Sequence, residues 1–411
     1  MSSTYQNNGQ YVLEEFIIDP TENRDEREFI NLIPLLIECN IYESIEDMTM
    51  SGSVSIIDAS AMDDIFPLDG NERISIRFHT AGNESNPIEY EALIYKISPK
   101  HRVTEHSNGF TIYFSSEASI LSTRSFVHSG FSDTTDRIVD NIYRQYLTRD
   151  IRKPLETTSA RGICNHTFGA ITPLEAISVL ERYASSTQGD AAYVFFENNR
   201  SFVFKPLQEL YQQEPVASYK YGLSGVYENV DKKNEEAFER IQGIKVKDEN
   251  SFSDKMMDGL YGSKHCVFDL VTKTFLGDSS VLYNKDEWFD ENRSLGKYPS
   301  RKKQESREDI IKLSYGSGPD DLILQQDRIE SKMKRAELDL FIAEIMVFGD
   351  SKIKCGDVIE GFIPNLNMDQ KNIINPFSGK FLITSICHNL VPSKYTQTFQ
   401  IQKDAYEVII P

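Results

Sequence analysis

Residues 379–405 read GKFLITSICHNLVPSKYTQTFQIQKDA, and they have the pattern of two strands joined by a short polar turn. In the second strand, large apolar residues alternate with polar residues, as they do when one face of a strand is buried. The apolar face carries Tyr395, Phe399 and Ile401. The opposite face is uniformly polar and carries Thr396, Thr398, Gln400 and Gln402. This stretch therefore predicts a β-hairpin with one buried face.

The adjacent Cys387 and His388 in the first strand raise the question of a catalytic dyad or a metal site. Neighbouring side chains on a strand point to opposite faces, so the two cannot act together unless the strand contains a bulge. We therefore predict that Cys387 is a small buried hydrophobe on the face of Phe381 and Ile383, with His388 on the other face.

The remaining residues give no catalytic constellation. The five cysteines, at 39, 164, 266, 355 and 387, form no CxxC, which argues against a disulfide framework and against the usual zinc spacings. Cys164 and His166 can share a face of a strand, but no third group is indicated that would orient them. No phosphate loop, G-x-S-x-G or H-E-x-x-H is present. The sequence thus predicts no enzyme, no metal and no cofactor.

Length and charge limit the possible classes of protein. A chain of 411 residues is too long for one ordinary core, so two to four domains are expected. The net charge of −19 disfavours a protein that grips nucleic acid through its phosphates. No apolar run approaches the length of a membrane helix, and the start, MSSTYQNNGQ, has no secretory pattern. We expect a soluble protein made in the cytoplasm, without an integral membrane segment.

The pattern along the chain changes from strand to helix and back to strand. The first 130 residues contain β-branched and aromatic runs, which predict a small antiparallel barrel or sandwich. Helices are predicted at 132–147 and 171–186, the second with a capping box at Thr172 and Glu175. A hairpin at 191–206, turning at Asn198–Asn199, completes a mixed α+β unit. Residues 207–320 read as irregular, and a helix at 321–338 precedes the last β segment.

The two ends of the chain carry similar patterns. Residues 90–118 and 379–405 both read as two strands around a polar turn, and they end in Glu117–Ala118 and Asp404–Ala405. Each is preceded by a strand that leaves a turn of glycine and an acidic residue, GNERISIRF in one case and GDVIEGFIP in the other. The match is short, and either chance or duplication can produce it. Duplication predicts two related β-barrels, one at each end.

The order of these motifs resembles the baseplate hub proteins of contractile-tail bacteriophages, the T-even-like hubs. The resemblance rests on the turn at Gly356–Asp357, the strand end at Ile363–Pro364, the Ser378-Gly379-Lys380 start and His388. It also rests on SGSVSIIDAS at 51–60 and on DGLYGSKHCVFDLVTKTF at 258–275. It implies an α+β, mainly β fold with two tube-type antiparallel barrels and an inserted mixed α/β region. The implied domains are 1–130 (first barrel), 131–206 (mixed α+β), 207–320 (irregular, spike-docking) and 321–411 (helix and second barrel).

The same resemblance implies a homotrimer in the tail baseplate of a virion. Its two barrels per chain form a ring with pseudo-sixfold symmetry that joins the hexameric tail tube to a central spike protein. DNA meets the protein only in transit through an acidic lumen, and tape measure and baseplate wedge proteins are further candidate partners. The base of a type VI or other contractile injection system is an alternative of the same structural class. A tail-associated cell-wall hydrolase using Cys164 or an acidic pair, and a ligand-binding module built on aromatics such as Trp288, are alternatives of other classes.

Three sets of interface residues follow from these expectations. Tube docking is expected at the barrel loops, with Asp69, Gly70, Glu72, Gly356 and Asp357. Spike docking is expected in the middle segment, with Tyr261, Tyr283, Trp288 and Phe289. The polar face of Thr396, Thr398, Gln400 and Gln402 is expected to line the lumen or to face solvent.

Overall fold

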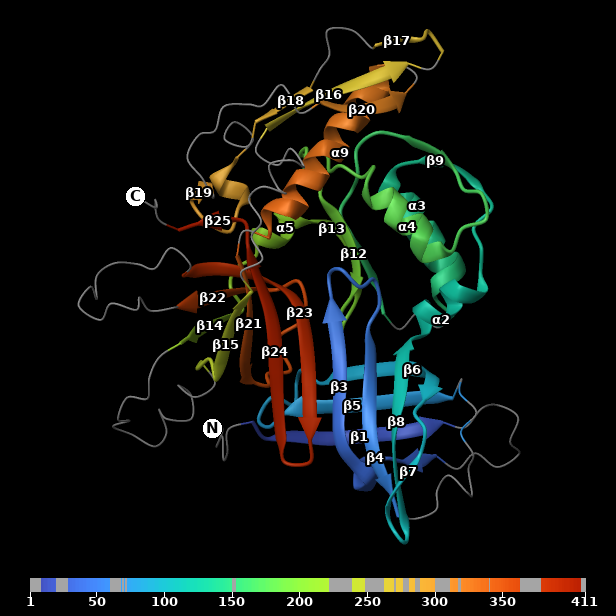
Figure 1. Cartoon of the computed structure of the whole chain (residues 1–411), viewed down its shortest axis with the longest axis vertical. Coiled ribbons are helices and arrows are strands. Elements are labelled where there is room, and N and C mark those ends of the chain that lie inside the picture. The colour runs from blue at the N-terminus through green and yellow to red at the C-terminus, as the bar shows by residue number, and fades with distance from the viewer. Residues whose placement is uncertain are drawn as a thin grey trace, which may run out of the picture.

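A computed structural model shows a mainly β protein with a few helices, as the sequence predicts (Figure 1). The structure describes residues 9–19, 29–59, 68, 70, 72–149, 153–221, 239–247, 262–269, 271–275, 281–284, 289–299, 311–316, 319–339, 341–362 and 378–407. Only the backbone is described for 262–265, 267, 269, 281–284, 311–316, 319–326 and 328. The predicted tube-docking residue Asp69, the spike-docking residues Tyr261 and Trp288, and the strand end at Ile363–Pro364 lie outside the described residues.

Six antiparallel strands near the start of the chain form the N-terminal unit, in the spatial order β3-β4-β8-β6-β5-β1. They are β1 (Tyr11–Asp19), β3 (Leu36–Ser44), β4 (Ser51–Asp58), β5 (Arg73–Thr80), β6 (Ile88–Ile97) and β8 (Ser107–Ser116). Short elements at the rim are β2 (Ile30–Asn31), η1 (Ile33–Leu35) and β7 (His101–Thr104). Apolar side chains alternate along these strands, and those on the inner side, such as Phe16, Ile76 and Phe114, form one buried core.

Six later strands form the C-terminal unit, in the spatial order β15-β21-β24-β23-β22-β14. They are β14 (Ala217–Lys220), β15 (Gly243–Lys247), β21 (Phe341–Phe348), β22 (Val358–Phe362), β23 (Gly379–Val391) and β24 (Lys394–Lys403). In chain order these strands occupy the same places as β1, β3, β4, β5, β6 and β8 of the N-terminal unit. The one difference in direction is that β14 pairs in parallel with β22, whereas β1 pairs antiparallel with β5.

The two units share bulges at matching positions. The register between β6 and β8 shifts between Ile94 and Lys96, and the register between β23 and β24 shifts between Ile383 and Ser385. The sequences around these shifts are Leu-Ile-Tyr-Lys-Ile at 93–97 and Leu-Ile-Thr-Ser-Ile at 382–386. A bulge alters the twist and direction of a strand, so equal bulges give the two sheets the same bend.

The units are joined edge to edge, because β23 pairs antiparallel with β3. One continuous sheet results, in which β24, β23, β3, β4 and β8 stand side by side (Figure 1). Among the described strands, the hydrogen-bonded path does not return to its start, so neither unit is seen as a closed barrel.

The predicted boundary at 320 leaves out two strands of the C-terminal unit. Strands β14 and β15 come from the segment that the sequence indicates to be irregular, and both lie at the outer positions of the sheet. They are only four and five residues long, so they carry too little alternation to be recognised.

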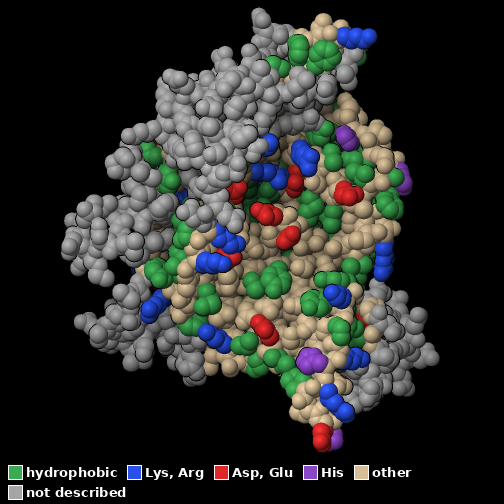
Figure 2. All heavy atoms as spheres, viewed as in Figure 1, with side chains coloured by type: hydrophobic (Ala, Val, Ile, Leu, Met, Phe, Trp, Pro, Cys, Tyr) green, Lys and Arg blue, Asp and Glu red, His purple; other side chains and the backbone are tan. Residues whose placement is uncertain are grey.

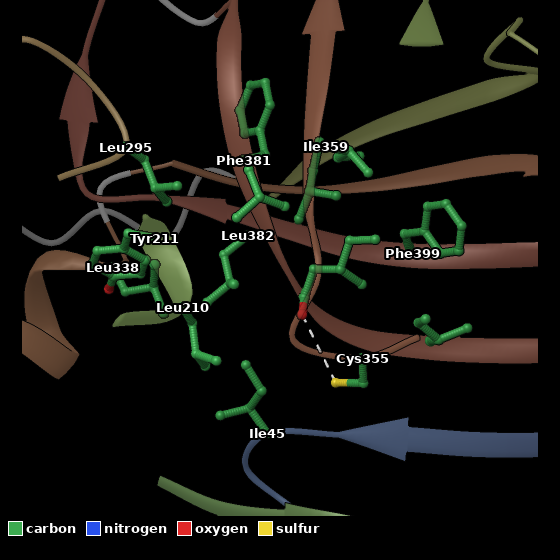
Figure 3. Close-up of a cluster of buried hydrophobic side chains, with 14 of the residues drawn as sticks. Ile45, Leu210, Tyr211, Leu295, Leu338, Cys355, Ile359, Phe381, Leu382 and Phe399 are labelled. Carbon is green, nitrogen blue, oxygen red and sulfur yellow. Dashed lines mark hydrogen bonds between the residues drawn. The ribbon is translucent and has the colours of Figure 1, made fainter. Parts of the chain in front are cut away.

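The C-terminal core receives side chains from several parts of the chain. Figure 3 shows Phe381, Leu382 and Phe399 from the sheet beside Leu210 and Tyr211 from α5 (Leu207–Tyr211). Ile45, which follows β3 of the N-terminal unit, also enters this core, and its backbone N–H donates to the carbonyl of Thr384 at 2.9 Å. The two units are therefore held together by backbone pairing and by shared apolar packing.

The middle of the chain forms a separate core of helices and short strands. Its elements are α2 (Glu117–Arg124), β9 (Gly130–Asp133), α3 (Thr135–Ile142), η2 (Tyr143–Leu147), β10 (Leu155–Thr157), β11 (Cys164–Thr167), α4 (Pro173–Glu181), β12 (Tyr193–Glu197) and β13 (Phe202–Pro206). The capping box of Thr172 and Glu175 and the hairpin turning at Asn198–Asn199 are confirmed. The predicted helix at 132–147 starts later, because β9 pairs with β11.

The predicted helix at 321–338 is confirmed as α9 (Pro319–Glu337). It follows a small sheet of β16 (Gly262–Asp269), β17 (Thr274–Phe275), β18 (Val281–Asn284) and β20 (Ile311–Gly316). The last elements are η3 (Glu291–Arg293), β19 (Tyr298–Pro299) and β25 (Ala405–Tyr406). Within the described part of the chain, no helix has both the length and the apolar character needed to cross a membrane.

Candidate assembly surfaces

Equivalent turns precede β5 and β22 in the two units. Gly70 and Gly356 have φ values of +85° and +89°, a region that residues with a Cβ rarely adopt. After each turn the carbonyl of an acidic residue accepts a hydrogen bond from the bulged strand. Ile94 N–H donates to Glu72 O, and Ile383 N–H donates to Asp357 O, each at 2.9 Å. In both units a positive-φ glycine thus lies one or two residues before the acidic residue whose carbonyl accepts this hydrogen bond.

The carboxylates of these turns are buried rather than exposed. Glu72 is 5% exposed and Asp357 is 4% exposed. The carboxylate of Asp357 accepts the backbone N–H of Lys354 at 3.0 Å, and burial raises its pKa to about 6. Gly356 packs on the middle unit, where an added Cβ would lie 2.8 Å from Phe196 Cζ. The side chains of Glu72 and Asp357 are therefore buried within the chain, and tube docking at these two loops stays a prediction.

Three of the four residues on the polar side of the hairpin are half-exposed, and one is buried. Thr396, Thr398 and Gln400 are half-exposed on β24, opposite the buried Tyr395, Phe399 and Ile401. Gln402 is only 3% exposed, because it lies at the end of the strand, where its amide donates to Asp339 Oδ1 at 3.4 Å.

This polar side continues across the junction into the N-terminal unit. In register with Thr396 lie Asn389 on β23, Asn40 on β3 and Ser53 on β4. We call the following half-exposed residues the polar face: Thr396, Thr398, Gln400, Ser385, Asn389, Asn40, Ser51, Ser53, Ser55 and Thr111. Their side chains are hydroxyls and amides. Figure 2 views this side of the sheet, and much of the surface over these strands is uncharged.

The sequence predicts a buried Cys387, and this prediction is wrong. In the structure Cys387 is half-exposed and its neighbour His388 is buried. The bulge after Ile383 shifts the alternation, so Cys387 is half-exposed beside the polar face and His388 is fully buried. The prediction that the two residues do not form a dyad is confirmed, since they lie on opposite faces. Cys387 Sγ is 3.8 Å from Asn40 Oδ1.

His388 takes part in a buried polar group at the junction of the two units. Its Nε2 is 3.0 Å from Glu43 Oε1 and its Nδ1 is 2.7 Å from the hydroxyl of Tyr395. The other oxygen of Glu43 accepts the backbone N–H of Cys355 at 2.9 Å. Glu43, His388 and Tyr395 are all 0% exposed. Sequence patterns missed this group, because Glu43 lies 345 residues from its histidine partner.

The other sequence candidates are placed without forming a catalytic centre. Cys164 is 8% exposed and packs in the middle core. Over the described ranges, no group of three or more His, Cys, Asp or Glu is arranged to hold a metal ion. Of the residues expected to dock a spike, Phe289 is half-buried before η3, and Tyr283 lies on β18.

Comparison with solved structures gives matches over almost the whole chain. A tail protein from Neisseria meningitidis matches with a TM-score of 0.56 and 11% identity, over 95% of this chain and 97% of that protein. The 43 kDa tail protein of prophage MuSo2 from Shewanella oneidensis matches with a TM-score of 0.56 and 11% identity, over 96% and 99% of the two chains. A chain of a Francisella PdpA–VgrG complex matches with a TM-score of 0.50 and 11% identity, over 100% of this chain and 56% of that one.

These similarities show that the chain has the fold of phage tail proteins. No protein-family model matches the sequence. No curated protein matches it either. The resemblance predicted from the order of the motifs is therefore confirmed at the level of a mainly β fold, while closed barrels are not seen among the described strands.

Proposed function

We propose that this chain is a structural hub protein of a contractile phage tail. Three copies form a ring that joins the hexameric tail tube to a central spike, in the baseplate of the virion. The observation that supports this best is the presence of two six-stranded units with the same strand order, the same bulge and the same glycine turn. The fold shared with tail proteins over 95% and 96% of the chain supports the same conclusion.

Symmetry gives the physical reason for two units in one chain. A threefold ring of such chains presents 3 × 2 = 6 similar units, which suits a partner with sixfold symmetry. Each unit then acts as a tube-type domain, and the strand edges left open in one chain are covered by its neighbours. Exposed edges are sites of association, so the ring also protects them.

The polar face is proposed to line the channel of this ring. Its hydroxyl and amide groups offer DNA no cation that would release counterions on binding, so the phosphates can slide past. The side chains of this face are themselves uncharged, but charged groups adjoin them, because Glu38 accepts from Asn40 and Asn389 and Lys247 donates to Gln400 at 3.2 Å. Tube docking at the loops around Gly70 and Gly356 also remains a proposal. The spike role of the segment around Phe289 remains a proposal.

A contractile injection system is the second candidate. It is favoured by the match of the whole chain to 56% of a chain in the PdpA–VgrG complex. In such a system the same ring carries a spike but delivers protein. The two candidates differ in cargo and share the trimer.

The solution mass of the purified protein, alone and with a candidate spike protein, tests the proposal. Light scattering is expected to give a trimer, or a monomer that becomes a complex of three chains with three spike chains. A monomer that does not respond to any spike protein would contradict the hub function.

A further inference from the structure

The junction inside one chain indicates how neighbouring chains meet. Strand β23 has two parts on its outer edge: residues 379–382 pair with β22, and residues 385–390 pair with β3 of the N-terminal unit. Strand β3 thus fits beside β22, along the part of β23 that follows the bulge. This is an established interface between a C-terminal unit and an N-terminal unit.

The equivalent place in the N-terminal unit has no strand beside it in the part of the chain that the structure describes. Strand β6 corresponds to β23, and its residues 88–93 pair with β5, which corresponds to β22. After the bulge, no described strand pairs with the edge of β6 and β7 that faces away from β8. Strand β15 corresponds to β3 and pairs with β21, while its other edge is open among the described strands.

We infer that β15 of one chain pairs antiparallel with the β6–β7 edge of the next chain, repeating the junction of β3 with β23. This inference rests on the trimeric ring proposed above and names its contact. In Figure 1, β15 lies on the left and β7 on the right, on either side of β24, β23, β3, β4 and β8. A head-to-tail contact of this kind closes into a ring when the rotation fits.

The register of the contact follows from the matching rows of the two units. In the N-terminal unit one row runs Leu93, Ser115, Ser51 and Tyr42. In the C-terminal unit the equivalent row runs Leu382, Gln402, Ile342 and Lys247. Tyr42 therefore corresponds to Lys247. By the same bulge alignment Cys387 corresponds to Ser98, because each follows the isoleucine that ends the five-residue motif.

Within the chain, Tyr42 lies directly opposite Cys387. Between chains, Lys247 is then expected opposite Ser98. The open edges also carry apolar side chains that a neighbour would cover: Tyr95 is 53% exposed, Val103 is 45% exposed and Val246 is 52% exposed. These values are high for apolar residues on strands, and each residue belongs to one of the two edges.

Lysines on both edges repel one another and so oppose this contact. Lys96 and Lys100 lie along one edge, and Lys245 and Lys247 lie on the other. Like charges opposite each other weaken a strand pair. Lys247 is already paired with Glu344 at 2.7 Å, and Lys96 lies over the ring of Tyr113 at 5.4 Å, which reduces the repulsion. Salt should therefore tighten the ring, because it screens the remaining repulsion.

Cysteine cross-linking tests the contact. The full chain carries Ser98→Cys and Lys247→Cys, with the half-exposed Cys266 and Cys387 changed to serine. Mild oxidation is expected to give a covalent trimer on a non-reducing gel, while either single variant gives no species above a dimer. The positive control is Tyr42→Cys in the otherwise natural chain, which is expected to link to Cys387 within one chain.

The outcomes separate this inference from the hub proposal. A particle that has the mass of a trimer, forms the Tyr42–Cys387 control link and gives no Ser98–Lys247 link would overturn the inferred contact and leave the hub standing. A protein that stays monomeric with and without spike protein would overturn both. A covalent trimer supports both.

Discussion

The two equivalent turn glycines provide a matched pair of substitutions. Gly70→Ala and Gly356→Ala both place a Cβ at a φ near +85° to +89°. Left-handed backbone costs a residue with a Cβ about 1–2 kcal/mol, and this term is common to both variants. The surroundings of the two glycines differ, and the difference can be worked out from the structure.

At Gly70 the one atom of the described residues within 4 Å of the new methyl group is the carbonyl oxygen of Ile94, at 3.9 Å. At Gly356 it lies 2.8 Å from Phe196 Cζ, closer than a Cβ normally approaches, so the buried ring of Phe196 has to shift. Overpacking of this kind adds about 1–3 kcal/mol. Gly70→Ala is therefore expected to lower the free energy of unfolding by about 1–2 kcal/mol, and Gly356→Ala by about 2–5 kcal/mol.

Urea unfolding followed by far-UV circular dichroism measures both effects, at one fixed protein concentration because assembly shifts the midpoint. The comparison uses the first transition of each variant, since a chain with several cores need not unfold in one step. Equal losses in the two variants, or a larger loss for Gly70→Ala, would refute the argument that Gly356 is fixed by its contact with Phe196.

Three further predictions concern the junction, the turn and the polar face. Glu43→Ala removes the carboxylate that contacts His388 Nε2 and is expected to lower the free energy of unfolding, measured in urea, by about 3–5 kcal/mol. Glu43→Gln should lower it less, and equal losses for the two variants would contradict this role of Glu43. Burial raises the pKa of Asp357 to about 6. Its unfavourable effect on the free energy of unfolding is therefore absent at low pH and grows as the pH rises toward 6. Asp357→Asn should flatten the dependence of the urea midpoint on pH between about 4 and 6, and an unchanged slope would count against this explanation. Thr398→Lys should leave the trimer mass unchanged and slow DNA ejection most at low salt, and ejection at the normal rate would argue against a channel lined by this face.

Local signals in the sequence were sufficient for several elements. The capping box of Thr172 and Glu175 and the hairpin at Asn198–Asn199 depend on residues a few positions apart, and both are present. The glycine turns and the Leu-Ile motifs of the two bulges were also visible as a weak repeat. Their structural equivalence explains why the two ends of the chain have similar patterns.

Features that depend on distant contacts were not predictable in the same way. Strands β14 and β15 gain their stability from partners more than 90 residues away, such as Ile345 opposite Ile244, and not from their own short sequences. The burial of Glu72 and Asp357 depends on how each turn packs, and a buried carboxylate looks the same in sequence as an exposed one. The half-exposure of Cys387 follows from a bulge that simple alternation does not contain.

The most direct test of the central claim is an image of the assembled particle viewed along its axis. Electron microscopy of the purified protein, with spike protein added if the chain alone is monomeric, measures its symmetry. We predict a threefold ring of six similar lobes around an open channel. Particles with another symmetry, or rings without six comparable lobes, would contradict the claim that the repeated unit adapts a threefold hub to a sixfold tube.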